Sequence, residues 1–212
     1  MARAESSCQP DSVPEDLPHI NQVVDSAALA RAIGEVTFSY PRANLLFSLA
    51  FGIEGELTHV RVLESGYGPD TADVLQRSAQ STVRPQPPEN AWGVRLRVAT
   101  GPNPTLVLER AAYCPPEAIR QSAPHRQARR SLPRLTREEW ALLRSLRSFR
   151  MKVLVDARGR ALTGSMTRGS GNASVDDYLV EWVALQRFRP AVLDGVLVLA
   201  WVELDASALN WP

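Results

Sequence analysis

Every second residue of FRMKVLVD (residues 149–156) is apolar, and these residues are Phe149, Met151, Val153 and Val155. A period of two residues is typical of a strand that buries one face and exposes the other. Residues 157–159 end in glycine and predict a turn, and residues 161–167 predict the returning strand. This pattern therefore indicates a β-hairpin.

A helical period precedes the hairpin. Thr136 and Glu139 have the spacing of a capping box, in which each side chain bonds the backbone of the other residue. An apolar stripe follows at Trp140, Leu143 and Leu146. The sequence thus predicts a helix with one apolar face.

A second helical period follows the hairpin. The glycine-rich segment RGSGNAS leads to Ser174, the predicted N-cap, with Asp177 in the first turn. The apolar face of this helix consists of Val175, Leu179 and Trp182. We expect the helix to end before Pro190, because proline disfavours a helical residue before it. Residues 195–204 predict a closing strand.

The first half of the chain repeats this order. Asp25 is the predicted cap of a helix, and residues 45–53 alternate as a strand. Gly55 matches Gly159 at an offset of 159 − 55 = 104. Pro85 matches Pro190 at an offset of 190 − 85 = 105. Residues 92–99 and 105–108 predict two further strands. A period this long indicates duplicated domains.

We therefore predict an α+β fold of two tandem modules, each a helix plus a β-hairpin, a helix and a closing antiparallel strand. The predicted organisation is an irregular leader (1–20), a first module (21–114), a Pro- and Arg-rich linker (115–134), a second module (135–205) and a C-terminal tail (206–212).

The composition narrows the class of partner. The chain has 212 residues, of which 44% are hydrophobic, and a formal net charge of +1. Nucleic-acid binding usually needs a basic excess, so we expect a protein partner and no nucleic acid. No window reaches the ~20 apolar residues of a spanning helix, so we expect no transmembrane segment. No signal peptide is visible, which leaves open a cytosolic protein or one whose signal peptide has been removed.

The spacing of the two cysteines does not indicate a metal site. Cys8 and Cys114 belong to no metal-spaced group, so we expect no structural zinc. In an oxidising compartment a Cys8–Cys114 disulfide is plausible, whereas in the cytosol two free thiols are expected. The sequence leaves both open.

The sequence contains no group of residues with the spacing of a known catalytic motif. His19, His59 and His125 are scattered, and the glycines of TGSMTRGSGNAS lack the Gly-Lys-Ser/Thr of a phosphate loop. Asp176 and Asp177 lie at a predicted helix start, where they favour the helix dipole. We expect a non-enzymatic protein with no catalytic residues, no cofactor and no metal, and an enzymatic site between the two copies is the competing hypothesis.

Residues 153–204 contain VDARG, GSG, a capped helix, RFRPA, DG and an alternating terminal strand, in that order. In order and spacing this segment resembles the C-terminal domain of TonB and its relatives. The first half resembles it as a degenerate copy that keeps IEG, SG and RP. The resemblance implies a small α+β domain in the Gram-negative envelope. In that family the terminal strand edge accepts an extended peptide of an outer-membrane receptor and conveys force to it.

This sequence lacks the N-terminal membrane helix and the long Pro-rich spacer of TonB, so the resemblance leaves force transmission open and implies only peptide or protein docking. We expect a periplasmic or envelope-associated adaptor or scaffold subunit that docks on a membrane-associated protein complex or receptor. The alternative is a soluble TonB-type transport protein that binds extended peptides of outer-membrane receptors. The oligomeric state is not predicted.

The closing segment RFRPAVLDGVLVLAWVEL (187–204) has two apolar faces. One face can fill the core with Val196, Val198, Ala200 and Val202. The other carries the predicted partner-binding residues Leu197, Leu199, Trp201 and Glu203, on an edge that can add an incoming strand. Alternatively, Leu199 and Trp201 cover the linker or the other copy. Trp211 in the tail is a further candidate, with a frayed terminus as its alternative.

Overall fold

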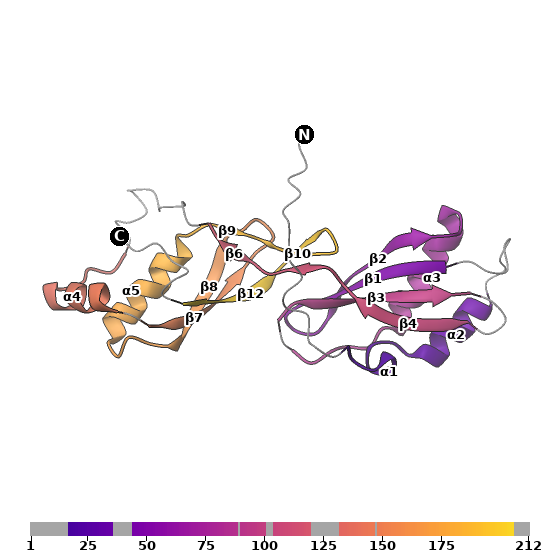
Figure 1. Cartoon of the computed structure of the whole chain (residues 1–212), viewed down its shortest axis with the longest axis horizontal. Coiled ribbons are helices and arrows are strands. Elements are labelled where there is room, and N and C mark those ends of the chain that lie inside the picture. Colours follow the sequence, from indigo (N-terminus) through magenta and orange to yellow (C-terminus); the bar gives the residue numbers. More distant parts are fainter. Residues whose placement is uncertain are drawn as a thin grey trace, which may run out of the picture. The chain divides into compact units, whose positions relative to one another are not determined.

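The computed structural model describes residues 17–35, 44–88, 90–100, 104–119, 132–146 and 148–205. The chain divides into two compact units (Figure 1). The first unit comprises Met1–Cys114 and Leu193–Val196, and the second comprises Pro115–Val192 and Leu197–Pro212. Both units are mixed α+β structures with antiparallel sheets, as the sequence predicts.

The first unit is built on a four-stranded antiparallel sheet in the order β2-β1-β3-β4. Its strands are β1 (Asn44–Phe51), β2 (Leu57–Ser65), β3 (Trp92–Ala99) and β4 (Thr105–Arg110), followed by the short β5 (Tyr113–Cys114). Its helices are α1 (Ile20–Val23), α2 (Ser26–Gly34) and α3 (Pro69–Thr82). The predicted cap of α2 is confirmed, because the Asp25 carboxylate accepts a hydrogen bond from the Ala28 amide at 3.0 Å.

The core of the first unit lies between one face of this sheet and helices α2 and α3. Alternate residues of β1 and β3 fill it, together with Leu29 and Ile33 of α2 and Leu75 of α3. The strand β1 is buried on its second face as well, where Leu46, Ser48 and Ala50 are all at most 3% exposed. The strand therefore has neighbours on both faces, which its alternation alone does not predict.

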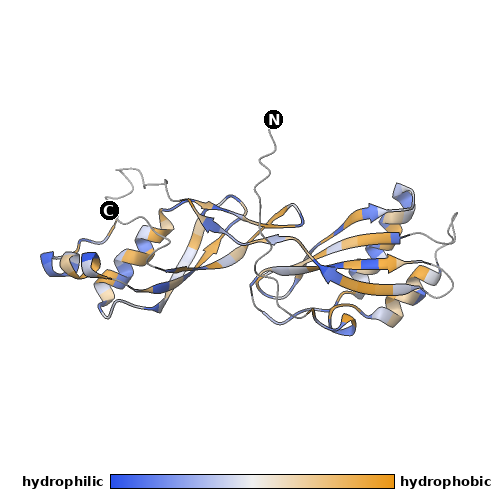
Figure 2. Cartoon of the chain, viewed as in Figure 1, coloured by the Kyte–Doolittle hydropathy of each residue, from blue (hydrophilic) through white to orange (hydrophobic). Residues whose placement is uncertain are grey.

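The second unit has a three-stranded antiparallel sheet in the order β12-β7-β8. Its main elements are α4 (Arg137–Ser145), β7 (Arg150–Val155), β8 (Ala161–Arg168), α5 (Ala173–Ala184) and β12 (Ala200–Asp205). The predicted inward residues of β7 are confirmed, and they pack on Val175, Leu179 and Trp182 of α5. Figure 2 shows hydrophobic and hydrophilic residues mixed along both the strands and α4.

The capping box of α4 is confirmed. The Thr136 hydroxyl accepts from the Glu139 amide at 3.2 Å, and the Glu139 carboxylate accepts from the Thr136 amide at 2.7 Å. The cap of α5 is not the predicted Ser174. Asn172 takes this place, since its side chain accepts from the Val175 amide at 3.1 Å. Both residue types are good caps, and the chain begins the helix at the earlier of them.

The two hairpins repeat the same register at an offset of 104. Phe47 pairs with Val62 in the first hairpin, and Met151 pairs with Met166 in the second. Both hairpins also carry two register shifts at matching places, at Leu46/Phe47 and Ala50/Phe51 in the first and at Arg150/Met151 and Leu154/Val155 in the second. The repetition found in the sequence is therefore also a repetition of strand pairing.

The turn glycines Gly55 and Gly159 occupy the same structural position. Both have positive φ, 79° and 72°, and each carbonyl accepts a hydrogen bond at 2.9 Å from a residue a few positions after the last helix of its unit, α3 in the first and α5 in the second. That donor is Gln86 in the first unit and Phe188 in the second, an offset of 188 − 86 = 102. A Cβ atom at either glycine would lie within 2.0 Å of the donor residue's carbonyl oxygen.

This geometry corrects the predicted match of Pro85 with Pro190. At an offset of 102 the counterpart of Pro190 is Pro88 (190 − 88 = 102). The reason is that α3 has 14 residues whereas α5 has 12, so the segment after the helix is displaced by two positions.

The prediction of one closing strand over 195–204 is wrong. Residues 195–204 hold two strands of different sheets, β11 (Val196–Val198) and most of β12. Before them come β9 (Phe188–Arg189) and β10 (Ala191–Leu193), with a tight turn at Asp194 and Gly195 between β10 and β11. Both turn residues have positive φ, 45° and 83°, as a two-residue hairpin turn requires.

The predicted module boundaries change in two places. Residues Leu193–Val196 belong to the first unit, although the sequence assigns them to the second module. In the predicted linker, β6 (Glu117–Ala118) pairs with β9, with Ala118 opposite Phe188. The predicted tail and most of the predicted leader and linker lie outside the described residues.

Candidate functional site

The strand β12 of the second unit is the counterpart of β3 in the first. Leu96 of β3 pairs with Phe47, and Leu204 of β12 pairs with Met151, the residue equivalent to Phe47. The offset between the two strands is therefore 204 − 96 = 108. Both strands turn apolar residues toward the core of their unit, and the opposite face carries Arg95 and Arg97 on β3 and Trp201 and Glu203 on β12.

The two strands differ in what lies on their second edge. In the first unit β4 pairs with β3 along six residues, from Val94 opposite Arg110 to Ala99 opposite Thr105. In the second unit β12 pairs with β7 and is the last strand of its sheet among the described residues. A strand edge offers backbone N–H and C=O groups to a further strand.

The predicted partner-binding residues do not all share one strand. Trp201 and Glu203 lie on β12, where Trp201 is half-buried and Glu203 is exposed. Leu199 lies between β11 and β12 and is 36% exposed, whereas Leu197 lies on β11 and is 51% exposed. Because β11 belongs to a different sheet from β12, Leu197 is not part of the same edge. Trp211 lies outside the described residues.

The sequence predicts that alternate residues of this segment face the core. This alternation holds on β12 only. Ala200 is fully buried, and Val202 is half-buried against the core. Val196 and Val198, also predicted to fill the core, are half-buried on β11. On the other face of β12, Glu203 forms a long ion pair of 3.8 Å with Lys152 of β7, and both side chains are more than half exposed. An exposed pair of this kind contributes little to stability.

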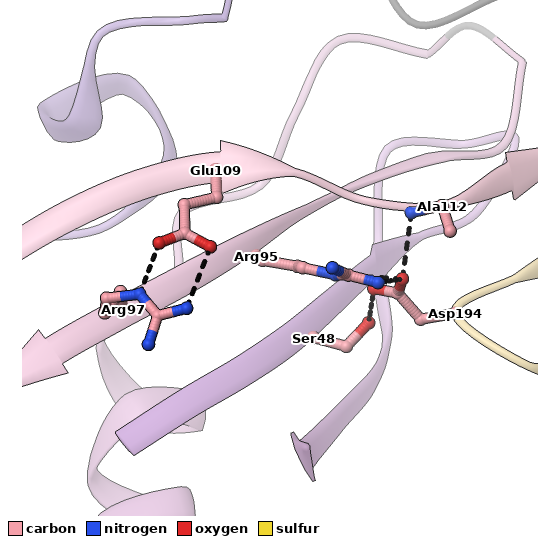
Figure 3. A network of polar contacts seen from close by, with 6 residues as sticks. All are labelled: Ser48, Arg95, Arg97, Glu109, Ala112 and Asp194. Carbon is pink, nitrogen blue, oxygen red and sulfur yellow. Dashed lines mark hydrogen bonds and ion pairs between the residues drawn. The ribbon is translucent and has the colours of Figure 1, made fainter. Parts of the chain in front are cut away.

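A second polar site lies in the first unit around Asp194, the first residue of the tight turn (Figure 3). Its carboxylate accepts hydrogen bonds from Arg95 Nε and Nη2 at 3.0 and 2.6 Å. It also accepts from the Ala112 amide at 2.8 Å and from the Ser48 hydroxyl at 2.7 Å. The Asp194 amide in turn donates to the Ala112 carbonyl at 2.8 Å.

This carboxylate is almost completely buried, with its side chain 1% exposed. Burial by itself would raise the pKa of Asp194. The hydrogen bonds from Arg95, from the Ala112 amide and from Ser48 outweigh that effect and hold the pKa below its usual value. All donors are supplied by residues of the first unit, so the site is complete as a carboxylate-binding site and its occupant is Asp194 itself.

A neighbouring charge cluster lies on the same sheet (Figure 3). Arg97 of β3 binds both carboxylate oxygens of Glu109 on β4, and its Nη1 lies 3.5 Å from Glu64 of β2. The hydrogen bond from Arg97 lowers the pKa of Glu109. Two arginines of β3, Arg95 and Arg97, thus each face a carboxylate.

The sequence did not single out Asp194 or Arg95. A signal for the turn was present, since Asp-Gly between apolar residues is typical of a two-residue hairpin. No local signal points to Arg95, because it lies 99 positions away from Asp194. Among the described residues, no group of three or more His, Cys, Asp and Glu side chains is placed to hold a metal ion.

His59 lies on β2 and is half-buried. It pairs with Ala50 on β1. Cys114 is disulfide-bonded. Cys8, with which the sequence leaves a disulfide open, lies outside the described residues.

Over the described part of the chain, none of the helices combines the length and the apolar character needed to cross a membrane. No protein-family model, curated protein or solved structure matches this chain.

Proposed function

We propose that this chain is a non-enzymatic protein of the cell envelope, built of TonB-like modules, that docks on a membrane-associated protein complex or receptor as an adaptor or scaffold subunit. Docking takes place by β-augmentation: an extended segment of the partner adds to the edge of β12. The observation that carries this proposal is the contrast between β3, whose second edge is paired with β4, and β12, which ends its sheet among the described residues.

The first unit provides an example of a strand added at the equivalent edge. The β3 edge accepts β4 along six residues of antiparallel pairing, so this fold accommodates a strand at that position. Backbone hydrogen bonds would supply affinity at β12, and the side chains of Leu199, Trp201 and Glu203 would supply the surface that selects the partner. Leu197 is not part of this surface, because it lies on another sheet.

The disulfide at Cys114 supports an envelope location. Disulfides persist in oxidising compartments such as the bacterial periplasm and are rare in the cytosol. The order of hairpin, helix and closing strand in the second unit is the order on which the resemblance to the TonB C-terminal domain rests.

Site-specific photo-crosslinking in the native organism tests the docking edge. A photoreactive phenylalanine analogue at Glu203, on β12, should crosslink to one partner protein through a segment in extended conformation. The matched control is the same analogue at Val74, which is 38% exposed but lies on helix α3 and so on no strand edge. Equal crosslinking from both positions, or none from Glu203, contradicts docking at β12. An outer-membrane receptor as the crosslinked protein favours the transport alternative over a scaffold subunit.

A further inference from the structure

We propose that the strand accepted by β12 is antiparallel to it and carries a lysine or arginine directly opposite Glu203. The inference rests on the proposed docking edge and specifies the chemistry of its partner: a basic extended segment of a protein. Two features of the chain carry it, namely the internal strand β4, which serves as a template, and a reversal of charge between β3 and β12.

The template is the pairing of β4 with β3. Leu108 lies opposite Leu96, and both belong to the core side of the sheet. Glu109 lies opposite Arg95 on the other side, and its carboxylate binds the diagonal neighbour Arg97. The strand that completes the first sheet thus presents an apolar residue followed by an acidic one, and the acidic residue faces two arginines.

The same positions on β12 carry the opposite charge. At the offset of 108, Leu96 corresponds to Leu204, and both are buried. Arg95 corresponds to Glu203 (203 − 95 = 108), and Arg97 corresponds to Asp205 (205 − 97 = 108). The buried leucine is therefore kept in both strands, whereas the two basic residues of β3 are replaced by acidic residues in β12.

A segment with the sequence of β4 would place the carboxylate of Glu109 opposite Glu203. Like charges directly opposite in a sheet destabilise the pairing, and opposite charges stabilise it. Lys152 does not remove this preference, because it lies on β7, and the ion pair with Glu203 is long and exposed. The partner that fits β12 therefore has an apolar residue opposite Leu204 and a basic residue opposite Glu203.

Two synthetic peptides test the inference on the full chain. One is acetyl-TLVLER-amide, the sequence of residues 105–110, and the other is acetyl-TLVLKR-amide, in which lysine replaces the residue corresponding to Glu109. With a fluorescent label on each, anisotropy titrations at low salt should show that the lysine peptide binds about fivefold more tightly. In the Glu203→Lys variant the preference should reverse, and in Glu203→Gln it should vanish.

The possible failures are distinguishable. Equal affinity of the two peptides for the wild type overturns the charge preference but leaves docking at β12, which the Glu203 crosslink tests independently. A preference that persists unchanged in Glu203→Lys also overturns the inference, because the charge would then be read elsewhere. Sedimentation measurements on the free protein add a third outcome: a dimer that competes with the lysine peptide would assign the β12 edge to a second copy of this chain and overturn the proposal.

Discussion

The carboxylate of Asp194 and the guanidinium of Arg95 form two hydrogen bonds, of 3.0 and 2.6 Å, between residues 99 positions apart. The Ser48 hydroxyl and the Ala112 amide complete the set of donors around Asp194. The four residues Leu193–Val196 are thereby part of the first unit, although the strands of the second unit flank them in sequence. A turn that the sequence marks only as Asp-Gly is therefore held by an ion pair whose carboxylate is buried.

Replacing Asp194 with asparagine should destabilise the first unit by about 2 kcal/mol, because Arg95 would lose its charged partner while the turn conformation is kept. Asparagine tolerates positive φ, so the loss would report the charge and not the turn. Urea denaturation measures the change. The control is Glu109→Gln in the partly exposed ion pair with Arg97, which should leave the free energy of unfolding nearly unchanged. Equal effects of the two substitutions would contradict the role assigned to Asp194.

The same carboxylate predicts a dependence on pH. Because the pKa of Asp194 in the folded protein lies below that of an unfolded chain, about 3.9, its ionised form stabilises the fold above that value. The contribution should be lost as the pH falls through the folded-state pKa. The difference in unfolding free energy between the wild type and Asp194→Asn should thus be constant near neutral pH and shrink below about pH 4. A difference that grows on acidification contradicts this prediction.

The turn glycine Gly159 allows a test of the repeated hairpin. In Gly159→Ala the new Cβ atom would lie 2.0 Å from the Phe188 carbonyl oxygen, so the hydrogen bond from Phe188 could not persist. Gly171→Ala is the matched control, because Gly171 also has positive φ but a Cβ atom added there would meet no atom within 4 Å. We expect the control to cost about 1 kcal/mol and Gly159→Ala to cost clearly more, measured as a lower denaturation midpoint. Similar costs would show that only backbone conformation matters at both sites.

The state of the cysteines can be measured directly. If the disulfide of Cys114 joins it to Cys8, the unreduced protein should contain no titratable thiol, and the reduced protein should contain two. Mass spectrometry of an unreduced digest should then yield one peptide pair that contains both cysteines. Two free thiols in protein purified from its native compartment without reductant would remove the support for an envelope location.

Local patterns predicted much of the fold. The capping box of Thr136 and Glu139 and the alternation of Phe149, Met151, Val153 and Val155 depend on neighbours within a few positions, and the structure has them as predicted. The register of the repeated hairpin also followed from an offset read in the sequence. The cap of α5 was missed by two positions because Asn172 and Ser174 are both good caps.

The remaining features depend on contacts between distant parts of the chain. The pairing of Asp194 with Arg95 has no local signal, and the match of Pro190 with Pro88 depends on helix length. For the candidate site, alternation predicted that Trp201 and Glu203 share a face of one strand. It did not predict that β4 pairs with the edge of β3. The contrast between β3 and β12 depends on this pairing.

Hydrogen exchange of the β12 amides, with and without the lysine peptide, tests docking at this edge most directly. Addition of a strand should slow exchange at amides within residues 200–205, whereas the amides of β3, which already has β1 and β4 as neighbours, should not change. Unchanged exchange in β12 at saturating peptide, or equal slowing in β3, would contradict docking at the β12 edge.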